Sequence, residues 1–437
     1  MNKWFGSAVL TAGMSFLVGC GGGGSDATGT SGSGKQKLVF DAVTRVTGCL
    51  NKSKPLAGVQ FIAHSADGKA IKTFTTDANG HIEADWPENA RHASVIYKNA
   101  KGVYTVNSTI EVTTTDFGKN YFGEDSTPGQ CSCTTLSIDW SDIKAAMPEY
   151  RLSVSGEFQN NLNTTVAVNS YRVCPNQDGQ YGKLQAMLIP NNAGQSYAME
   201  TEISSLLSNP NVKLAFSQFQ NAGRPINVVS NVIKQNVRTF TPSQQGRAYV
   251  SYYPYTESTP VRVFERNDVK STASISSNTS GDGYTNAVTR RVVVEKNANS
   301  VQINLPTNHS MVAQSIQTSI INATEAGGIN YDFSYMTDYA EASYALTSAK
   351  VEIFFSGPMK AQIPTFEWPA DLMAAMQSDT ADFELEVYFM GYGQNTDLKA
   401  FRQRLADKSR NLALEAQDPA LLDYRFFSIY FGDNKLL

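Results

Sequence analysis

Short segments in which apolar and polar residues alternate recur along this chain, and they constrain its fold more than any other feature. The clearest is 383–389, where Phe383, Leu385, Val387 and Phe389 occupy every second position and polar residues occupy most of the others. A period of two is that of a β-strand, so we expect a sheet with one buried and one solvated face. A last strand is predicted over 424–431.

Composition agrees with a β-rich exported protein. Charged residues make up only 17% of the 437 residues, and the formal net charge is −4. Few charges together with many β-branched, aromatic and small polar residues favour strands over surface helices. A chain of this length exceeds what one core usually serves, so several domains are expected. The mildly acidic balance excludes the basic footprint of a nucleic-acid-binding protein.

Other segments depart from the alternating pattern. Residues 397–414 carry Leu398, Phe401 and Leu405 on one stripe with basic residues elsewhere, which predicts an amphipathic helix packed on a sheet. A short second helix is predicted over 369–376. Residues 275–283 are dense in Ser, Asn and Gly and predict a surface loop.

The first folded unit is predicted over 37–125 and carries a recognisable pattern. Residues 55–59 read Pro-Leu-Ala-Gly-Val, and 76–80 read Thr-Asp-Ala-Asn-Gly, a turn between two extended segments. This stretch resembles the carboxypeptidase regulatory-like and immunoglobulin-like modules of bacterial surface proteins. The resemblance implies a β-sandwich used for spacing or binding. The fold class we predict is therefore mainly β, with tandem β-sandwich (immunoglobulin-like) domains and one or two short helices near the C-terminus.

The chain begins with the features of a secretory signal. Lys3 precedes an apolar segment that ends in Leu17-Val18-Gly19-Cys20, which describes a signal peptide over 1–19. This ending resembles the lipobox of bacterial lipoproteins, which implies that Cys20 becomes the lipidated first residue. Residues 20–36 are mostly Gly, Ser and Thr and predict a flexible tether. We expect an outer-membrane lipid anchor as the membrane partner.

Four further cysteines remain in this exported chain, and an even number favours disulfides. Cys131 and Cys133 are separated by a single residue, Ser132, which is too close for an unstrained mutual bridge in extended chain. We therefore favour pairing one of them with Cys49 and the other with Cys174, which would join the first domain to the second. The remaining domain predictions are a β-rich domain over 134–310 and another, with the amphipathic helix, over 311–437.

Catalytic patterns are weak. The four histidines show no metal-ligand spacing, and no Gly-x-Ser-x-Gly nucleophile turn occurs. Residues 29–35 spell most of a phosphate-binding loop, but Gln36 stands where Ser or Thr should bind magnesium, and no strand is predicted before it. We predict no catalytic residue, no metal site and no cofactor.

Aromatic residues offer the remaining functional signal. Tyr252, Tyr253 and Tyr255 form a dense cluster, and adjacent strand residues face opposite ways, so at least one should face outward. Such rings contact sugars and protein surfaces well. We therefore expect a non-enzymatic surface lipoprotein, an adhesin-like or envelope-assembly component with a protein or carbohydrate ligand. The alternatives are a carbohydrate-active or other hydrolytic surface enzyme, and a solute-capture lipoprotein.

Overall fold

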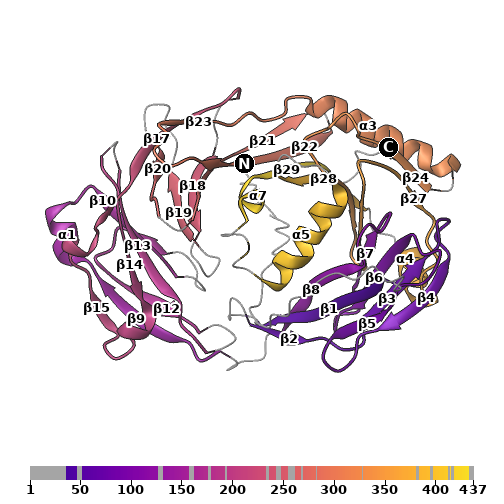
Figure 1. Cartoon of the computed structure of the whole chain (residues 1–437), viewed down its shortest axis with the longest axis horizontal. Helices are drawn as coiled ribbons and strands as arrows, with labels where there is room; N and C mark the ends of the chain where they lie inside the picture. The colour runs from indigo at the N-terminus through magenta and orange to yellow at the C-terminus, as the bar shows by residue number, and fades with distance from the viewer. Residues whose placement is uncertain are drawn as a thin grey trace, which may run out of the picture.

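A computed structural model of the chain describes residues 36–46, 52–125, 131–156, 162–175, 179–191, 194–232, 236–242, 248–253, 261–266, 269–281, 283–326, 328–379, 383–393, 397–411, 414 and 418–432. The protein is mainly β, as predicted. Two β-sandwiches lie at opposite ends of the molecule, and one large sheet spans the distance between them (Figure 1).

The N-terminal end is a sandwich, called here the first sandwich, which contains the strands of the predicted unit 37–125. One of its sheets has the order β2-β1-β5, with β8 parallel to β1. The strands of this sheet are β1 (Lys37–Val46), β2 (Ser53–Pro55), β5 (His81–Asp85) and β8 (Asp116–Asp125).

The facing sheet is the edge of a twelve-stranded sheet that continues through the molecule. Its order is β19-β18-β21-β22-β29-β28-β25-β26-β7-β6-β3-β4. The strands from the first part of the chain are β3 (Gln60–His64), β4 (Ala70–Thr75), β6 (His92–Lys98) and β7 (Tyr104–Thr109). The others are β18 (Asn236–Pro242), β19 (Ala248–Tyr253), β21 (Ser271–Gly281), β22 (Tyr284–Val294), β25 (Glu341–Thr347), β26 (Val351–Gly357), β28 (Glu384–Tyr392) and β29 (Tyr424–Phe431).

The second sandwich follows in sequence and has its own core. One sheet contains β10 (Tyr150–Gly156), β11 (Leu162–Thr164), β13 (Lys183–Pro190), β14 (Tyr197–Glu202) and β16 (Asn221–Ala222). The other contains β9 (Thr134–Asp139), β12 (Val168–Val173) and β15 (Asn211–Lys213). Trp140, Leu152 and Leu188 are fully buried between the sheets.

Two smaller sheets and several helices complete the fold. The sheets are formed by β17 (Arg224–Val229), β20 (Val261–Val263) and β23 (Ser300–Gln302), and by β24 (Gly328–Asp332) with β27 (Lys360–Pro364). The helices are α1 (Ser141–Ala146), α2 (Ile203–Leu206), the 3-10 turn η1 (Phe216–Gln218), α3 (His309–Ala326), α4 (Ala370–Ser378), α5 (Leu398–Arg410) and α7 (Pro419–Leu422).

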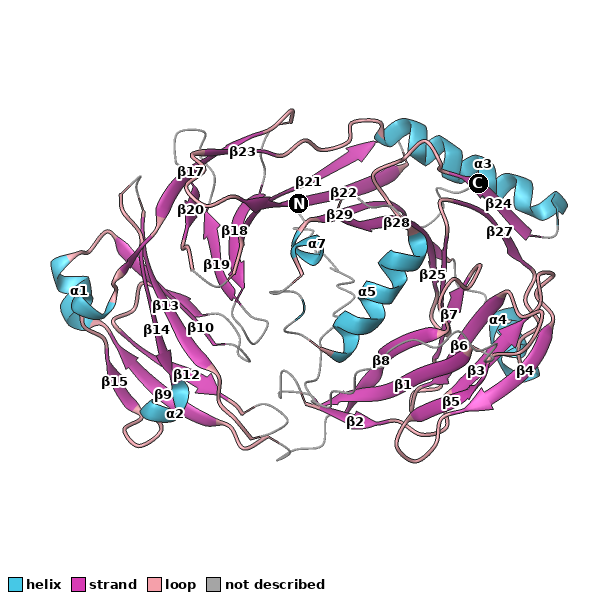
Figure 2. Ribbon diagram, viewed as in Figure 1, coloured by secondary structure: helices cyan, strands magenta, loops and turns pink. Residues whose placement is uncertain are grey.

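Helices cover both faces of the large sheet, with α3 on the outer side of the arc and α5 on the inner side (Figure 2). Leu385, Val387 and Phe389 of β28 join the core that includes residues of α3. Tyr388 and Met390 of the same strand join a separate core with α5. The alternation at 383–389 was therefore interpreted correctly as a strand. On its predicted solvated face, Glu384 is exposed, whereas Tyr388 is buried in the core shared with α5.

The predicted amphipathic helix is present as α5 and is shorter than expected. It begins after Asp397, whose carboxylate accepts hydrogen bonds from the amides of Lys399 and Ala400, and it ends at Arg410. Phe401 is buried against the sheet, as the stripe required. The helix predicted over 369–376 is present as α4.

Three features differ from the sequence-based predictions. The division near residue 310 does not interrupt the sheet, since strands before and after it pair side by side, as β22 does with β29. The predicted loop at 275–283 is mostly strand β21, hydrogen-bonded to β22 along its length. The longest helix, α3, was not predicted, because its Val, Ile, Thr and Ser residues have low helix propensity.

An ion pair joins the inner helix to the large sheet. Arg402 of α5 lies 2.8 Å from Glu341 of β25, and their side chains are 8% and 5% exposed. The same guanidinium donates hydrogen bonds to the carbonyl oxygens of Ile110, Glu111 and Ser356. A buried charge is tolerated only when it is paired and hydrogen-bonded in this way. This contact unites the first and last parts of the chain.

Candidate functional site

The described residues form an open hollow of about 670 Å³ at one end of the first sandwich. Two connections build it, the β3–β4 turn and the β5–β6 loop, and Gln36 at the start of β1 completes the lining. Loops at the end of a sandwich are held by a rigid scaffold and are common binding positions. Its volume falls in the range of sites for small molecules. We take this hollow as the candidate binding site.

Trp86, the residue after β5, supplies the aromatic surface of the hollow. Its ring lies 6.4 Å from Phe61 and 6.1 Å from Phe117, centroid to centroid. Phe61 is buried in the core of the first sandwich, and Phe117 and Trp86 both pack against that core, so the indole is held in place. The backbone amide of Trp86 donates to the carbonyl of Gln36, which fixes the start of the loop.

The β3–β4 turn forms one wall. Gly68 has a φ of +84°, and an added Cβ would lie 3.0 Å from the carbonyl carbon of Thr365, so this position requires glycine. Asp67 accepts a hydrogen bond from Ser65 and pairs with Lys69. These contacts lower the pKa of Asp67 below its usual value, and the hydrogen bond from the Ser65 hydroxyl has the largest effect. Asp67 is therefore ionised, and Lys69 already offsets its charge.

The β5–β6 loop forms the opposite wall with Glu88, Asn89 and Arg91, whose side chains are exposed. Asn89 has a φ of +65°, a conformation that asparagine tolerates better than most residues. The amide of Arg91 donates to the carbonyl of His64, which ties the loop to β3. The rim therefore presents carboxylate, amide and guanidinium groups around the indole.

Two buried histidines support this wall from inside the protein. A carbonyl oxygen can only accept a hydrogen bond, so Nδ1 of His64 must carry the proton that it donates to the Gly68 carbonyl (3.1 Å). Nε2 of the same ring accepts a hydrogen bond from the Ser94 hydroxyl (3.0 Å). The amide of Glu111 donates to Nδ1 of His92 (3.0 Å), so Nε2 of His92 donates to Ala66 (3.3 Å). Both rings are thus fixed as neutral tautomers.

The environment of these histidines opposes protonation. His64 is 0% exposed and His92 is 5% exposed. Burial lowers the pKa of His64 to about 4 despite its hydrogen bond to Gly68, and burial also lowers the pKa of His92. The rings of both pack against Phe366. Both histidines therefore support the wall as neutral, hydrogen-bonded side chains.

The other two histidines also make structural contacts. His81 pairs with Asp41 at 2.7 Å, and Nε2 of His309 lies 2.7 Å from the carbonyl oxygen of Pro306. Among the described residues, no group of three or more His, Cys, Asp or Glu side chains is arranged to hold a metal ion.

Asp77 has a structural role in the turn before β5. Its carboxylate accepts hydrogen bonds from the amides of Asn79 and His81 in an Asx turn.

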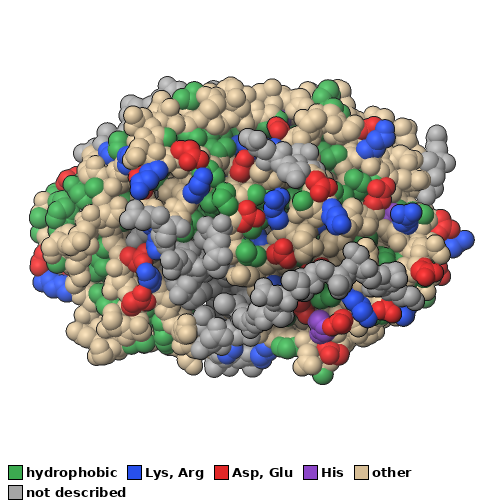
Figure 3. All heavy atoms as spheres, viewed as in Figure 1, with side chains coloured by type: hydrophobic (Ala, Val, Ile, Leu, Met, Phe, Trp, Pro, Cys, Tyr) green, Lys and Arg blue, Asp and Glu red, His purple; other side chains and the backbone are tan. Residues whose placement is uncertain are grey.

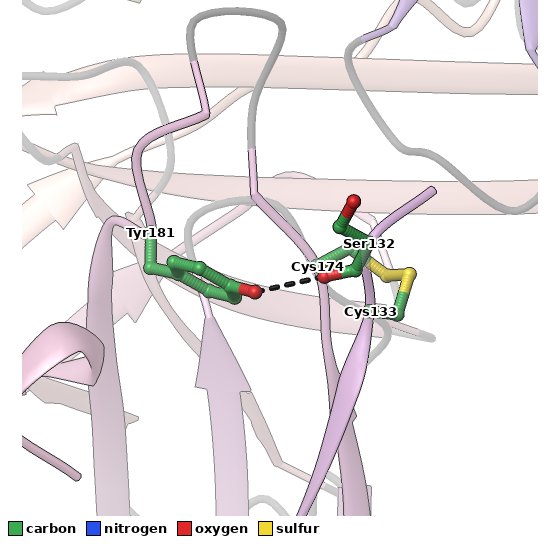
Figure 4. The surroundings of a disulfide bond; sticks show 4 residues. All are labelled: Ser132, Cys133, Cys174 and Tyr181. Atoms are coloured by element: carbon green, nitrogen blue, oxygen red, sulfur yellow. Dashed lines mark hydrogen bonds between the residues drawn. A yellow bond between two sulfur atoms is a disulfide. The ribbon is translucent and has the colours of Figure 1, made fainter. Parts of the chain in front are cut away.

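The second sandwich contains a disulfide bond between two of the predicted cysteines. Cys133 is bonded to Cys174, 41 residues further along the chain, and the Tyr181 hydroxyl donates to the carbonyl of Ser132 beside it (Figure 4). Cys131 is also disulfide-bonded. The sequence left open which of Cys131 and Cys133 would pair with Cys174. Cys49 lies outside the described residues.

The remaining predicted site residues are only partly described. The backbones of Tyr252 and Tyr253 lie in β19, opposite Arg238 and Val237 of β18, at one edge of the large sheet. Their side chains, and all of Tyr255, lie outside the description, as do the signal segment, Cys20 and the predicted tether up to residue 35. Gln36, the last residue of the predicted tether, lines the hollow. Within the described part of the chain, no helix has the length and apolar character needed to cross a bilayer.

The hollow was not found by sequence reasoning. Its lining comes from residues about 55 positions apart, Gln36 to Arg91, which only the fold brings together. The one local signal was Trp86 followed by Pro87 at a turn. On the face of the molecule drawn in Figure 3, basic side chains lie among acidic ones and form no continuous patch of positive or negative charge.

Comparisons with known proteins give no family. No family model matches the chain, and no curated protein matches it. Among solved structures, the Bacillus anthracis TIE protein is similar at 13% identity and a TM-score of 0.15, over 62% of this chain and 50% of that one. The E. coli alpha-2-macroglobulin is similar at 10% identity and a TM-score of 0.11, over 77% of this chain and 26% of that one. This chain spans half or less of each, and at these TM-scores neither supports an argument about function.

Proposed function

We propose that this chain is a lipid-anchored, non-enzymatic component of the bacterial cell envelope that serves as a binding or structural scaffold. The observation that carries the proposal is the succession of Leu17-Val18-Gly19-Cys20, a Gly-rich tether, and a first strand that begins at Lys37. A lipidated Cys20 would leave the folded part linked to the outer membrane by about 16 residues of flexible chain, a root-mean-square reach of about 20 Å.

The covalent chemistry of the second sandwich supports an exported location. Cys133 and Cys174 form a disulfide, and disulfides persist in oxidising compartments outside the cytoplasm. The structural contacts of the four histidines support a non-enzymatic role. The hollow at Trp86 supports binding, because its residues come from loops on a rigid sandwich.

Metabolic labelling with an alkyne-bearing palmitate tests the anchor. The wild-type protein should carry the label in the membrane fraction and be released by detergent. Cys20→Ser should be unlabelled, whereas the matched control Cys174→Ser should keep the label, since this cysteine is not at the lipobox. Mass spectrometry that finds an unmodified Cys20 in the mature protein would contradict the proposal.

The proposal that the protein is not an enzyme is tested separately. Purified mature protein is incubated with cell-wall and storage polysaccharides, and the products are analysed by mass spectrometry. No cleavage beyond the protein-free control is expected. Reproducible cleavage would favour the hydrolytic alternative and identify its bond.

A further inference from the structure

We infer that the hollow beside Trp86 binds a neutral oligosaccharide. The inference deepens the proposed function, because it rests on a binding role and names the ligand class at the same site. It draws on three properties of the hollow: a fixed aromatic ring, a rim of planar polar groups and a nearly balanced charge.

The aromatic ring suits the C–H face of a sugar. Trp86 is partly exposed, and its ring contacts Phe61 of the core and Phe117, which packs against that core. A ring fixed in advance loses little conformational entropy when a ligand stacks on it. An indole also offers the largest apolar contact area of any side chain, with a polar edge.

The rim suits the hydroxyl groups of a sugar. Glu88, Asn89 and Arg91 carry planar groups that can contact two neighbouring hydroxyls at once. Carboxylates accept hydrogen bonds, guanidinium groups donate them, and the asparagine amide does both. Sugar hydroxyls also donate and accept, so all three groups can be satisfied by one ligand.

The charge balance argues against ionic ligands. Asp67 is paired with Lys69, which leaves Glu88 and Arg91, of opposite charge, on the β5–β6 wall of the hollow. A phosphate would meet the carboxylate of Glu88, and a cation would meet the guanidinium of Arg91. A neutral ligand meets neither penalty. The hollow, at about 670 Å³ and open to solvent, has room for more than one ring.

The test is calorimetric titration of the full mature chain with cellotetraose, maltotetraose and chitotetraose. At least one should bind saturably below about 10 mM. Trp86→Ala should weaken that binding about tenfold or more, and Trp86→Phe should weaken it less. Tyr335→Ala is the matched control, because this aromatic side chain is 41% exposed and lies beside Ser315 of α3, far from the hollow in sequence.

Two rim variants keep the test interpretable if the Trp86 variants fail to fold. Glu88→Gln and Arg91→Ala change exposed side chains, so they should weaken binding severalfold while the thermal unfolding curve stays unchanged. Saturable binding that none of these variants weakens would place the sugar elsewhere and overturn the inference. Absence of binding to all three probes would overturn it as well. A labelled Cys20 in that same protein would show that the anchoring proposal survives the failure.

Discussion

The first and second sandwiches are built from similar short strands, but their inner organisation differs. In the second sandwich, the core lies between its own two sheets and includes Leu152 and Trp140. In the first, one sheet is part of the twelve-stranded sheet. Phe61 therefore packs in the core of the sandwich, while its neighbour Ile62 packs on the other face in the main core.

This difference teaches that a β-sandwich is not always an independent domain. Strand β3 reads Gln-Phe-Ile-Ala-His and is buried at four of its five positions. Strand β7 pairs in parallel with β26, about 250 residues later in the chain. A sheet buried on both faces depends on elements that cover both faces. The first sandwich shares strands with the large sheet and should thus unfold together with the C-terminal part. The described strands of the second sandwich do not pair with that sheet, and its outer apolar contact is the packing of Met187 and Ile189 with Phe264, so it should unfold more independently.

The largest expected effect comes from the contact that joins the first and last parts of the chain. Arg402→Leu would leave Glu341 buried without its partner and would remove the guanidinium donor from the carbonyl oxygens of Ile110, Glu111 and Ser356. We expect a loss of about 3–5 kcal/mol in the free energy of unfolding. Urea denaturation measures it, with Arg404→Leu as the control, because Arg404 is about one-third exposed and its ion pair with Asp418 spans 3.4 Å. Equal effects of the two substitutions would contradict the structure.

A matched pair of core truncations compares the two sandwiches. Ile96→Ala, on the second buried face of the first sandwich, and Leu152→Ala, inside the second, should each cost about 2–4 kcal/mol. Ile96→Ala should lower the urea concentration at which the C-terminal strands unfold, whereas Leu152→Ala should leave that concentration nearly unchanged. Proteolysis monitored by mass spectrometry reports the unfolding of the C-terminal strands and of the second sandwich separately. A common response to both variants would show that the sandwiches unfold as one unit.

Removing the disulfide should affect the second sandwich alone. The Cys133–Cys174 bond closes a loop of 41 residues, and constraining such a loop in the unfolded chain contributes about 2–4 kcal/mol. The double variant Cys133→Ser with Cys174→Ser should lower the melting temperature of the second sandwich. Calorimetry should find the transition of the large sheet unchanged, and a shift in both would contradict the expected independence.

Acid should act on the first sandwich with a smaller effect. The pKa of buried His64 is about 4, below the 6.5 of an unperturbed histidine. Below pH 6.5 the unfolded chain binds the proton and the folded chain does not, so stability falls as pH drops from about 6.5 towards 4 and is unaffected above that window. By pH 5 the loss should reach about 2 kcal/mol.

Denaturation at pH 7 and at pH 5 measures this effect. His64→Asn keeps a donor near Gly68 and should reduce the pH dependence, with the remainder due in part to His92, whose pKa is also lowered. A pH dependence that is the same in the variant and the wild type would mean that His64 is not the group responsible.

The sequence predicted strands well where alternation was local, as at 383–389, and the turn at 77–80. It missed β21, because Ser, Asn and Gly favour loops and only pairing with β18 and β22 makes this segment a strand. The division near residue 310 was wrong, because no local feature of the sequence shows that β22 pairs with β29. Pairing across the chain is a property of the whole fold.

The candidate site was harder to predict than the fold. A tyrosine cluster is visible as adjacent letters, whereas the hollow joins Gln36, Asp67, Trp86 and Arg91 from separate connections. No spacing rule relates such residues, because their positions are set by the lengths of the strands between them. Trp86 beside a proline was the only local indication, and it carried no information about its neighbours.

Native-state hydrogen exchange at increasing urea tests the central claim most directly, that one sheet unites the first and last parts of the chain. Amides of β7, such as that of Val106, and of β26, such as that of Ile353, are register neighbours. They should merge into a single unfolding unit with the same free energy and the same urea dependence, while β10 and β13 form another. Exchange of β7 at a much lower free energy than β26 would show a first sandwich that opens alone, and it would contradict the account.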